Sequence, residues 1–407
     1  MTTVRTLARL LRDAQTAAPE DVVATLLEGA RSLGGRDLVL YLIDYEQQVL
    51  QPNPDLLADG QPILPASVLG TMAGRCFATQ VLLEAPVDGG VNVWVPVTER
   101  AQRLGVLALT VDALDEQGCE FAEELGLLAA LLVMAASPYS DHYHLQRRRQ
   151  EMNLAAEMQW SLLPPLAFRA GGTTVAGLLE PAYEVGGDCF DYALNGDRLS
   201  LAVFDAMGHG LPSSVISSLA VGAYRHARRT GVALARLFPA MDDAVAGLMG
   251  DTFVTVLAAE LDTRTGRFSW TSAGHPCPLV VRSGSVLPDV DQAPGLPLGL
   301  GLLAHDDTVQ PAELSLQPGD RVLLFTDGVV EARSPEGEEF GLEHLMDLFV
   351  RESASGRHAS EVLRRLVRAC RDFQGGRLRD DATLLLLEWA GPPTAPSRPR
   401  LSLPQPR

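Results

Sequence analysis

Short apolar runs separated by turns rich in glycine, proline and aspartate dominate the chain from about residue 167 to residue 389. Each run has the length and the side-chain content of a β-strand. The runs are LSLAVF, FVTVLAAEL, RFSWTSA, CPLVVR, RVLLFT and TLLLLEW. Two helical patterns interrupt them, LPSSVISSLAVGAYRHARR and ASEVLRRLVRACRDF. Many strands with few long helices predict packed β-sheets flanked by helices.

An earlier segment, residues 19–138, alternates helical and strand patterns after an N-terminal segment, residues 1–18. The sequence DVVATLLEGARSL has apolar residues at helical spacing, and LVLYLID, NVWVPV and RLGVLALTV have the pattern of strands. The helical pattern EFAEELGLLAALLVMAAS closes the segment. This order predicts an α+β module with its helices on one face of a sheet.

A charged helical pattern, DHYHLQRRRQEMNLAAEMQWSLL, predicts a connector helix within residues 139–165 that ends at Pro164. Leu145, Met152 and Gln159 recur every seven residues, which is the spacing of a coiled-coil seam. A single amphipathic helix packed on its own domain is equally compatible with the pattern. The sharper hypothesis is a homodimer formed through this helix.

Composition and charge narrow the functional classes. The chain has 407 residues, 46% of them hydrophobic, and a formal net charge of −18, which fits a soluble protein of two domains. So acidic a chain argues against nucleic acid as a partner, because phosphates require a basic surface. Five scattered cysteines, no secretory signal and no apolar run of membrane-spanning length predict a cytoplasmic protein without membrane association. The proline-rich residues 391–407 are expected to be disordered.

Aspartates beside glycines stand at the ends of several apolar runs. They are Asp188 in EVGGD, Asp205 in FDAMGHG, Asp327 in FTDG, and Asp380 and Asp381 in RDDAT. Taken singly, an aspartate beside a glycine is a common turn sequence. Several carboxylates at the rim of one core are costly, however, unless cations neutralise them. Oxygen-only sites suit Mg²⁺ or Mn²⁺, and two such ions about 3.5–4 Å apart can activate a shared water.

These motifs, in this order, resemble the SpoIIE-type branch of the PPM (protein phosphatase 2C-like) serine/threonine phosphatases. The resemblance covers residues 155–389 and is carried by EMQWSLLPP, PAYEVGGDCFDY, DAMGHGLPSS, TSAGHPCPLVV, LPLGL, LQPGDRVLLFTDGVVEAR and DDATLLLL. It implies an α-β-β-α phosphatase domain over residues 166–390 that hydrolyses phosphoserine or phosphothreonine on a partner protein. It also implies two Mn²⁺ or Mg²⁺ ions, water as the nucleophile, and a phosphorylated anti-sigma-factor antagonist as the usual substrate.

The resemblance assigns a role to each acidic motif. Asp205 would bridge both ions. Asp188 and the backbone carbonyl of Ala206 would complete the shell of one ion. Asp327 and Asp380 would hold the other, with the second aspartate of the DDAT motif as the alternative ligand.

Two histidines lie in the same motifs. His275, in SAGHP, could donate a proton to the leaving oxygen. A histidine in such a turn more often shapes the loop by hydrogen bonding, and we favour that interpretation for His275 and for His209 in GHG.

The module at residues 19–138 resembles a GAF-type sensory domain, through VWVPVTERAQRLGVLALTV and the EELGLLAALLV helix. The leading hypothesis is therefore a phosphatase regulated by an N-terminal sensor. One alternative is a non-catalytic interaction protein that keeps the fold, although the intact aspartate set argues against it. A small-molecule phosphohydrolase would require a deep basic pocket, and a shallow protein-docking site is favoured instead.

Overall fold

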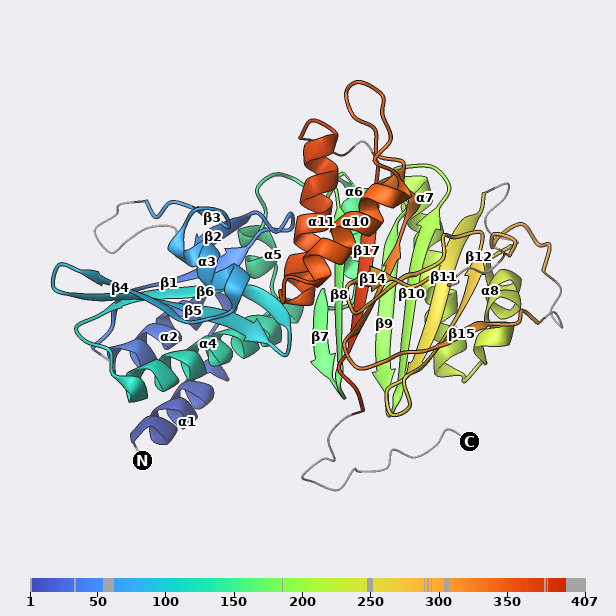
Figure 1. Cartoon of the computed structure of the whole chain (residues 1–407). Coiled ribbons are helices and arrows are strands. Elements are labelled where there is room, and N and C mark those ends of the chain that lie inside the picture. The colour runs from blue at the N-terminus through green and yellow to red at the C-terminus, as the bar shows by residue number, and fades with distance from the viewer. Residues whose placement is uncertain are drawn as a thin grey trace. The chain divides into compact units, whose positions relative to one another are not determined.

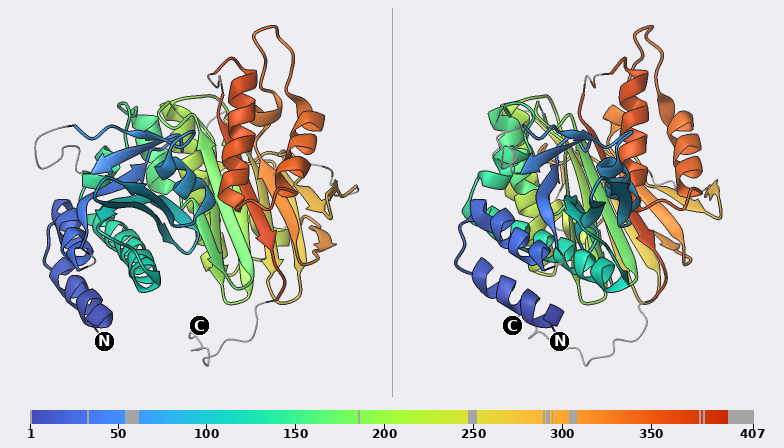
Figure 2. Two further views of the ribbon diagram at one scale, coloured as in Figure 1. Left: turned by 60° about the vertical axis from the view of Figure 1, so that its left-hand side comes forward. Right: turned by 90° about the vertical axis from the view of Figure 1, so that its left-hand side faces the viewer.

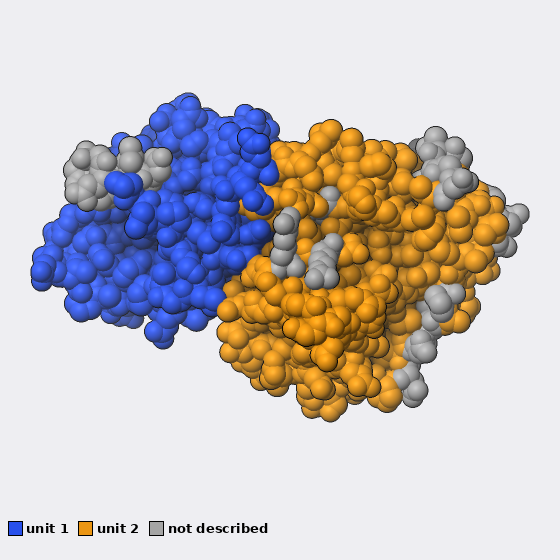
Figure 3. Space-filling view, turned by 90° about the horizontal axis from the view of Figure 1, so that it is seen from above, with its two compact units in different colours: residues 1–151 blue, residues 152–407 orange. Residues whose placement is uncertain are grey.

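A computed structural model describes residues 2–392 except 33, 54–61, 185, 247–251, 289, 291, 292, 294, 304–307, 377 and 379. The chain divides into two compact units, residues 1–151 and residues 152–407 (Figure 3). Most of the proline-rich tail predicted to be disordered lies outside the described residues. Within the described ranges, every helix falls short of the length and apolarity that crossing a bilayer requires.

The first unit is built on one antiparallel sheet whose described strands run in the order β3-β2-β1-β6-β5-β4. The strands are β1 (Arg36–Ile43), β2 (Val49–Asn53), β3 (Ala66–Ser67), β4 (Leu83–Val87), β5 (Gly90–Glu99) and β6 (Gln102–Val111). The helices are α1 (Thr2–Ala14), α2 (Val22–Arg31), α3 (Met72–Thr79) and α4 (Glu116–Ala136). Short 3-10 turns, η1 (Pro19–Asp21) and η2 (Ser137–Tyr139), precede α2 and follow α4.

Helices cover both faces of this sheet, so the prediction that they share one face is wrong. Leu10 of α1, Leu26 of α2 and Leu125 of α4 belong to one buried cluster. Phe77 of α3 belongs to a second cluster, with Ile43 of β1. Figure 1 shows α3 on the opposite side of the sheet from α2 and α4. The run LVLYLI is apolar at successive positions because β1 is buried on both faces.

The connector is two short helices, so the prediction of one continuous helix is wrong. They are α5 (His142–Gln146) and α6 (Leu154–Leu162), with residues 147–153 between them. The interruption has two physical causes. Arg147 caps the C-terminus of α5, and its side chain donates from Nε to the Ile43 carbonyl at 2.9 Å.

Asn153 then starts a new helix. Its side chain accepts a hydrogen bond from the Ala156 amide at 2.8 Å, the contact of an N-cap. The expected seven-residue seam is therefore not continuous: Leu145 is exposed, whereas Gln159 is fully buried in the second unit. Whether the chain dimerises through this segment stays a prediction.

The second unit contains two antiparallel sheets. One has the described order β15-β12-β11-β10-β9, and the other β14-β13-β16-β17-β8-β7. The strands are β7 (Ala167–Ala170), β8 (Thr173–Glu180), β9 (Cys189–Asn195), β10 (Arg198–Ala206), β11 (Val254–Asp262), β12 (Arg267–Ala273), β13 (Leu279–Arg282), β14 (Ser285–Val286), β15 (Ala312–Ser315), β16 (Asp320–Phe325) and β17 (Ala382–Trp389). The helices after α6 are α7 (Leu211–Arg229), η3 (Leu234–Arg236), α8 (Leu237–Val245), α9 (Asp327–Val330), α10 (Gly341–Ser353) and α11 (Ala359–Phe373).

The two sheets pack face to face, with helices on the outside. Val203 of β10 lies in the core between the sheets with Leu324 and Leu385 of the second sheet. Its neighbour Phe204 points the other way and packs in the cluster beneath α7 and α8. Helix α11 contacts β8 and β17 on the far side (Figure 1 and Figure 2). These layers confirm the α-β-β-α sandwich, and α8 and α10 are helices that the sequence patterns missed.

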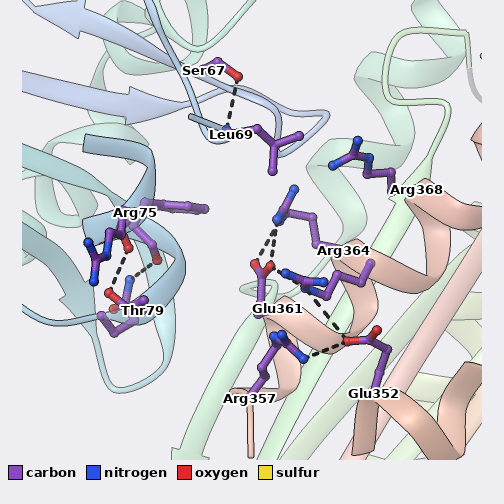
Figure 4. A network of polar contacts seen from close by, with 12 residues as sticks. Ser67, Leu69, Arg75, Thr79, Glu352, Arg357, Glu361, Arg364 and Arg368 are labelled. Atoms are coloured by element: carbon purple, nitrogen blue, oxygen red, sulfur yellow. Dashed lines mark hydrogen bonds and ion pairs between the residues drawn. The ribbon is translucent and has the colours of Figure 1, made fainter. Parts of the chain in front are cut away.

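A polar network ties α11 to α10. Glu361 forms a buried ion pair with Arg364 at 2.7 Å and a second with Arg365 at 3.1 Å. Glu352 of α10 pairs with Arg357 at 3.2 Å (Figure 4). Arg365 of α11 also lies 3.8 Å from Glu352, so an ion pair joins the two helices.

Candidate functional site

Four chain segments converge at one end of the sandwich. Asp188 stands directly before β9, and Asp205 is next to last in β10. Because β9 and β10 are antiparallel neighbours, the start of one strand lies beside the end of the other. The same rule brings Asp327, after β16, close to the doublet that precedes β17 in the second sheet. The site therefore draws carboxylates from both sheets.

The carboxyl groups interact strongly with one another. Burial raises the pKa of Asp205 to about 7, and the negative charge of Asp327, a hydrogen bond to it and the charges of Asp380 and Asp381 act in the same direction. Burial, followed by the charges of Asp205 and Asp381, raises the pKa of Asp188 well above its ordinary value. Among the described residues, the charged groups with the largest effects on these two pKa values are carboxylates. The structure thus brings the predicted acidic residues together.

This cluster matches a hard divalent cation in its donor chemistry. Carboxylate and carbonyl oxygens are the ligands that Mg²⁺ and Mn²⁺ prefer, and a cation would relieve the repulsion that raises the pKa of Asp205. Among the residues that the structure describes, no three Asp, Glu, His or Cys side chains are arranged to hold a metal ion as they stand. The residue types and their common location fit a divalent-cation site, although the described side chains are not arranged to coordinate one ion as they stand.

Asp188 is held from several sides. Its carboxyl is 3% exposed and accepts a hydrogen bond from the Thr326 hydroxyl at 2.6 Å. Its carbonyl oxygen accepts one from the Gln159 side chain at 2.6 Å. The sequence patterns predict no role for Thr326 and place Gln159 in a coiled-coil seam rather than at this site. The sequence signal that could have identified such partners is a polar residue at a position where the surrounding apolar pattern predicts burial.

The glycines before Asp188 allow close contact between chain segments. A Cβ atom on Gly187 would lie 2.3 Å from the carbonyl oxygen of Ala206, the predicted backbone ligand. Because that neighbour is backbone and cannot swing away, only glycine fits at this position. The close approach fixes the position of the Ala206 carbonyl relative to the Asp188 turn.

A matched pair of glycine substitutions tests this constraint. We expect Gly187→Ala to lower the midpoint of thermal unfolding, because its methyl group displaces the Ala206 peptide. Gly222→Ala is the control, since Gly222 lies inside α7 and a methyl group added there would meet nothing within 4 Å. The control should raise stability by about 0.5–1 kcal/mol. Equal effects of the two substitutions in thermal unfolding would contradict the assignment.

His275 supports the loop around the site. Its ring is 2% exposed, and Nε2 lies 3.0 Å from the Phe325 carbonyl, so Nε2 carries the proton. Nδ1 therefore accepts from the Thr255 hydroxyl at 2.9 Å. Burial lowers the pKa of His275 to about 4, opposed by the Phe325 contact. Both nitrogens are engaged within the protein, which agrees with a structural rather than an acid–base role.

We expect His275→Ala to lower the free energy of unfolding by about 2–4 kcal/mol, because two buried groups lose their partners. The stabilisation by neutral His275 is complete above the unfolded pKa of about 6.5 and is lost as the pH falls toward 4. The variant should lack that part of the pH dependence in chemical denaturation. The exposed His226 supplies the control, His226→Ala. An altered pH–rate profile in a folded His275 variant would instead indicate acid–base catalysis.

His209 differs from His275, because its residue is exposed. It lines a cleft of about 500 Å³ with residues of the acidic doublet and of the glycine turn. The lining residues are Pro181, Glu184, Gly186, His209, Gln374, Leu378, Asp380 and Asp381. The cleft is thus the open side of the carboxylate cluster.

Comparison with known proteins identifies the second unit. The family model described as Stage II sporulation protein E (SpoIIE) matches residues 195–390. The chain contains a SpoIIE-family phosphatase domain. The matched segment includes every predicted acidic ligand except Asp188, which lies just before it. The family resemblance drawn from the sequence motifs is confirmed.

Two curated relatives are named as phosphoserine phosphatases. RsbU of Bacillus subtilis (strain 168) is 24% identical over 271 residues, which cover 65% of this chain and 78% of RsbU. RsbP of the same organism is 24% identical over 190 residues, covering 45% of this chain and 46% of RsbP. The chain thus spans less than half of the second relative. Among solved structures, the SiaA-PP2C domain of Pseudomonas aeruginosa is 21% identical, with a TM-score of 0.48, over 57% of this chain and 94% of that domain.

Proposed function

We propose that this chain is a metal-dependent protein serine/threonine phosphatase. The observation that carries the proposal is the convergence of Asp188, Asp205, Asp327 and the aspartate doublet at one end of a SpoIIE-family sandwich. A lone catalytic acid would not need several mutually repelling carboxylates. A site that neutralises a phosphate with cations does need them.

In this proposal, the acidic residues and one backbone carbonyl would bind the cations, and His275 would not act as a proton donor. Asp205 would bridge two ions, Asp188 and the Ala206 carbonyl would bind one of them, and Asp327 and Asp380 would bind the other. Bound Mn²⁺ or Mg²⁺ would supply a water of lowered pKa and positive charge beside the phosphate. The pKa of buried His275 is too low for it to protonate a leaving group at neutral pH.

The proposed substrate is phosphoserine or phosphothreonine on a partner protein, specifically an anti-sigma-factor antagonist. The names of RsbU and RsbP as phosphoserine phosphatases support the substrate class. The identity of the partner rests on the family resemblance of the motifs. We further propose a cytoplasmic location.

The first unit is proposed to be a GAF-like sensory module that regulates the phosphatase and pairs two copies through residues 139–165. The exposed large hydrophobic residues described in this segment, which a second copy would cover, are Tyr139, Leu145 and Leu154, at 87%, 59% and 62% exposure. We expect the full chain to be a dimer in light scattering, and residues 152–407 alone to be monomeric and to turn over substrate at a different rate. Equal rates and equal oligomeric states would contradict both regulation and pairing.

A direct assay tests the proposed activity. Purified full-length protein should release inorganic phosphate from a phosphoserine protein and hydrolyse a chromogenic phosphate ester in Mn²⁺, and both activities should stop in EDTA. The alternative function is a non-catalytic interaction protein that keeps the fold. That alternative predicts partner binding with no phosphate release at any Mn²⁺ or Mg²⁺ concentration.

A further inference from the structure

The two aspartates of the DDAT motif have different surroundings. Asp381 is 9% exposed, and its Oδ2 faces three successive backbone amides, those of Gly186 at 2.7 Å, Gly187 at 2.8 Å and Asp188 at 3.4 Å. Asp380 is exposed, and its Oδ1 accepts a hydrogen bond from the Asp381 amide at 2.9 Å. Both aspartates line the cleft. The buried residue thus faces the chain and the exposed one faces the solvent side of the site.

The turn that Asp381 holds, residues 186–188, has its carbonyl groups bonded as well. The Ser214 hydroxyl donates to the Gly186 carbonyl at 2.7 Å, and the Ser217 hydroxyl donates to the Gly187 carbonyl. The carbonyl of Asp188 is the acceptor for the buried amide of Gln159 at 2.6 Å. Helices α6 and α7 therefore hold one side of the turn, and Asp381 holds the other.

An ionised carboxylate is a strong partner for several amides at once. Charge-assisted hydrogen bonds of this kind are about twice as strong as neutral ones, and three amides occupy the oxygen that receives them. A Cβ atom on Gly186 would lie 2.9 Å from that same Oδ2, so the turn also requires glycine to bring its amides this close. The side chain of Asp188 follows directly from this turn.

We propose that Asp381 is a positioning residue that holds the turn of residues 186–188, and with it Asp188, whereas Asp380 is the cation ligand of the doublet. The inference rests on the proposed function for what Asp188 is positioned to do. The hydrogen bonds between Asp381 and the turn are present in the chain without any ligand. Because Oδ2 of Asp381 is engaged by the amides of the turn, these bonds support Asp380 rather than Asp381 as the proposed ligand of the doublet.

The test compares Asp381→Ala, Asp381→Asn and Asp380→Ala in the full-length protein. Amide hydrogen exchange by NMR or mass spectrometry is measured in EDTA, so that neither metal nor activity enters the readout. We expect exchange at residues 186–188 to be at least about tenfold faster in Asp381→Ala and unchanged in Asp380→Ala. Asp381→Asn keeps an acceptor oxygen without its charge, so its exchange should be intermediate, and it covers the case in which the alanine variant does not fold.

Mn²⁺ titration by calorimetry supplies the second readout. Asp380→Ala should bind one Mn²⁺ fewer than the unmodified protein, whereas Asp381→Asn should bind the same number with weaker affinity. Loss of one Mn²⁺ in Asp381→Asn with undisturbed exchange at the turn would make Asp381 a ligand and overturn the inference. Unchanged exchange in both Asp381 variants would also overturn it. An inactive protein that still shows the exchange difference would count against the proposed phosphatase but not against the positioning role.

Discussion

Replacing Asp205 with asparagine should abolish phosphatase activity, lowering kcat/KM by at least about 10³-fold. Asp205 is the carboxyl on which the charges of Asp327, Asp380 and Asp381 converge, and it comes from the other sheet. An amide of the same shape keeps the packing but removes the negative charge that two cations would share. The measurement is phosphate release from a phosphoserine protein at saturating Mn²⁺.

For stability we expect the opposite of the loss in activity: the same substitution should not destabilise the folded protein. Without metal, the raised pKa of Asp205 shows that its ionised form is disfavoured in the folded protein. Asparagine removes that cost, so Asp205→Asn should be at least as stable as the unmodified protein in EDTA at pH 7.5. An inactive but stable variant separates loss of a ligand from loss of the fold.

Asp347 provides the matched control, because it is an exposed aspartate on α10, outside the acidic cluster. Asp347→Asn should retain full activity and the Mn²⁺ dependence of the unmodified protein. Activity that survives in Asp205→Asn would remove the central carboxylate from the mechanism and contradict a site in which Asp205 is shared by two cations.

The phosphatase sandwich was predictable because its strands are buried and its turns are marked. Runs such as LSLAVF and RVLLFT became β10 and β16. Antiparallel pairing brings the aspartate that follows the first run beside Asp188 and the aspartate that follows the second beside the doublet. The helices α7 and α11 also matched their patterns. Hydrophobic periodicity and the glycine and proline residues of the turns were sufficient to predict these elements, because burial alone determines their structure.

The connector could not be predicted in the same way, because contacts distant in sequence interrupt its helical pattern. Arg147 bonds to a carbonyl of β1, about a hundred residues earlier, and Asn153 can cap a helix only once the preceding residues have left it. Helical propensity is a weak preference that such contacts override. Leu145 lies in α5 and Gln159 in α6, so the seven-residue spacing that relates them through Met152 does not run along one helix.

The sequence could not predict the different roles proposed for the two aspartates of the doublet either. Asp380 and Asp381 are chemically identical neighbours, and each is adjacent to the same buried strand. The backbone amides of residues 186–188, nearly two hundred residues away, distinguish them. A sequence motif names the residues of such a site, whereas the partners that assign their roles come from the fold.

Removing divalent metal should destabilise the second unit, and more so at pH 7.5 than at pH 5.5. Burial and carboxylate neighbours raise the pKa of Asp205 to about 7, and burial, with the charge of Asp380 adding to it, raises that of Asp381 to about 6. Both groups ionise near pH 4 in the unfolded chain. Between these values the folded protein without metal binds more protons than the unfolded chain, so its stability falls as the pH rises through 7.

A bound cation reverses that dependence, because it requires the ionised carboxylates that high pH supplies. At about 100 times its Kd, Mn²⁺ adds about 2.7 kcal/mol of stability, which corresponds to roughly 5–10 °C in the Tm of a unit of this size. At pH 5.5 protons compete for the same oxygens, so the shift in Tm should be less than half as large. Differential scanning calorimetry of the full chain, with Mn²⁺ or EDTA at each pH, measures both shifts.

Asp205→Asn should lose most of the Mn²⁺-dependent shift at pH 7.5, while Asp347→Asn should keep it. A shift of equal size at both pH values would mean that Mn²⁺ binds away from the buried carboxylates. A shift that persists in Asp205→Asn would place the cation at other oxygens of the cleft. Because the readout is thermal stability, the experiment locates the cation without depending on the choice of substrate.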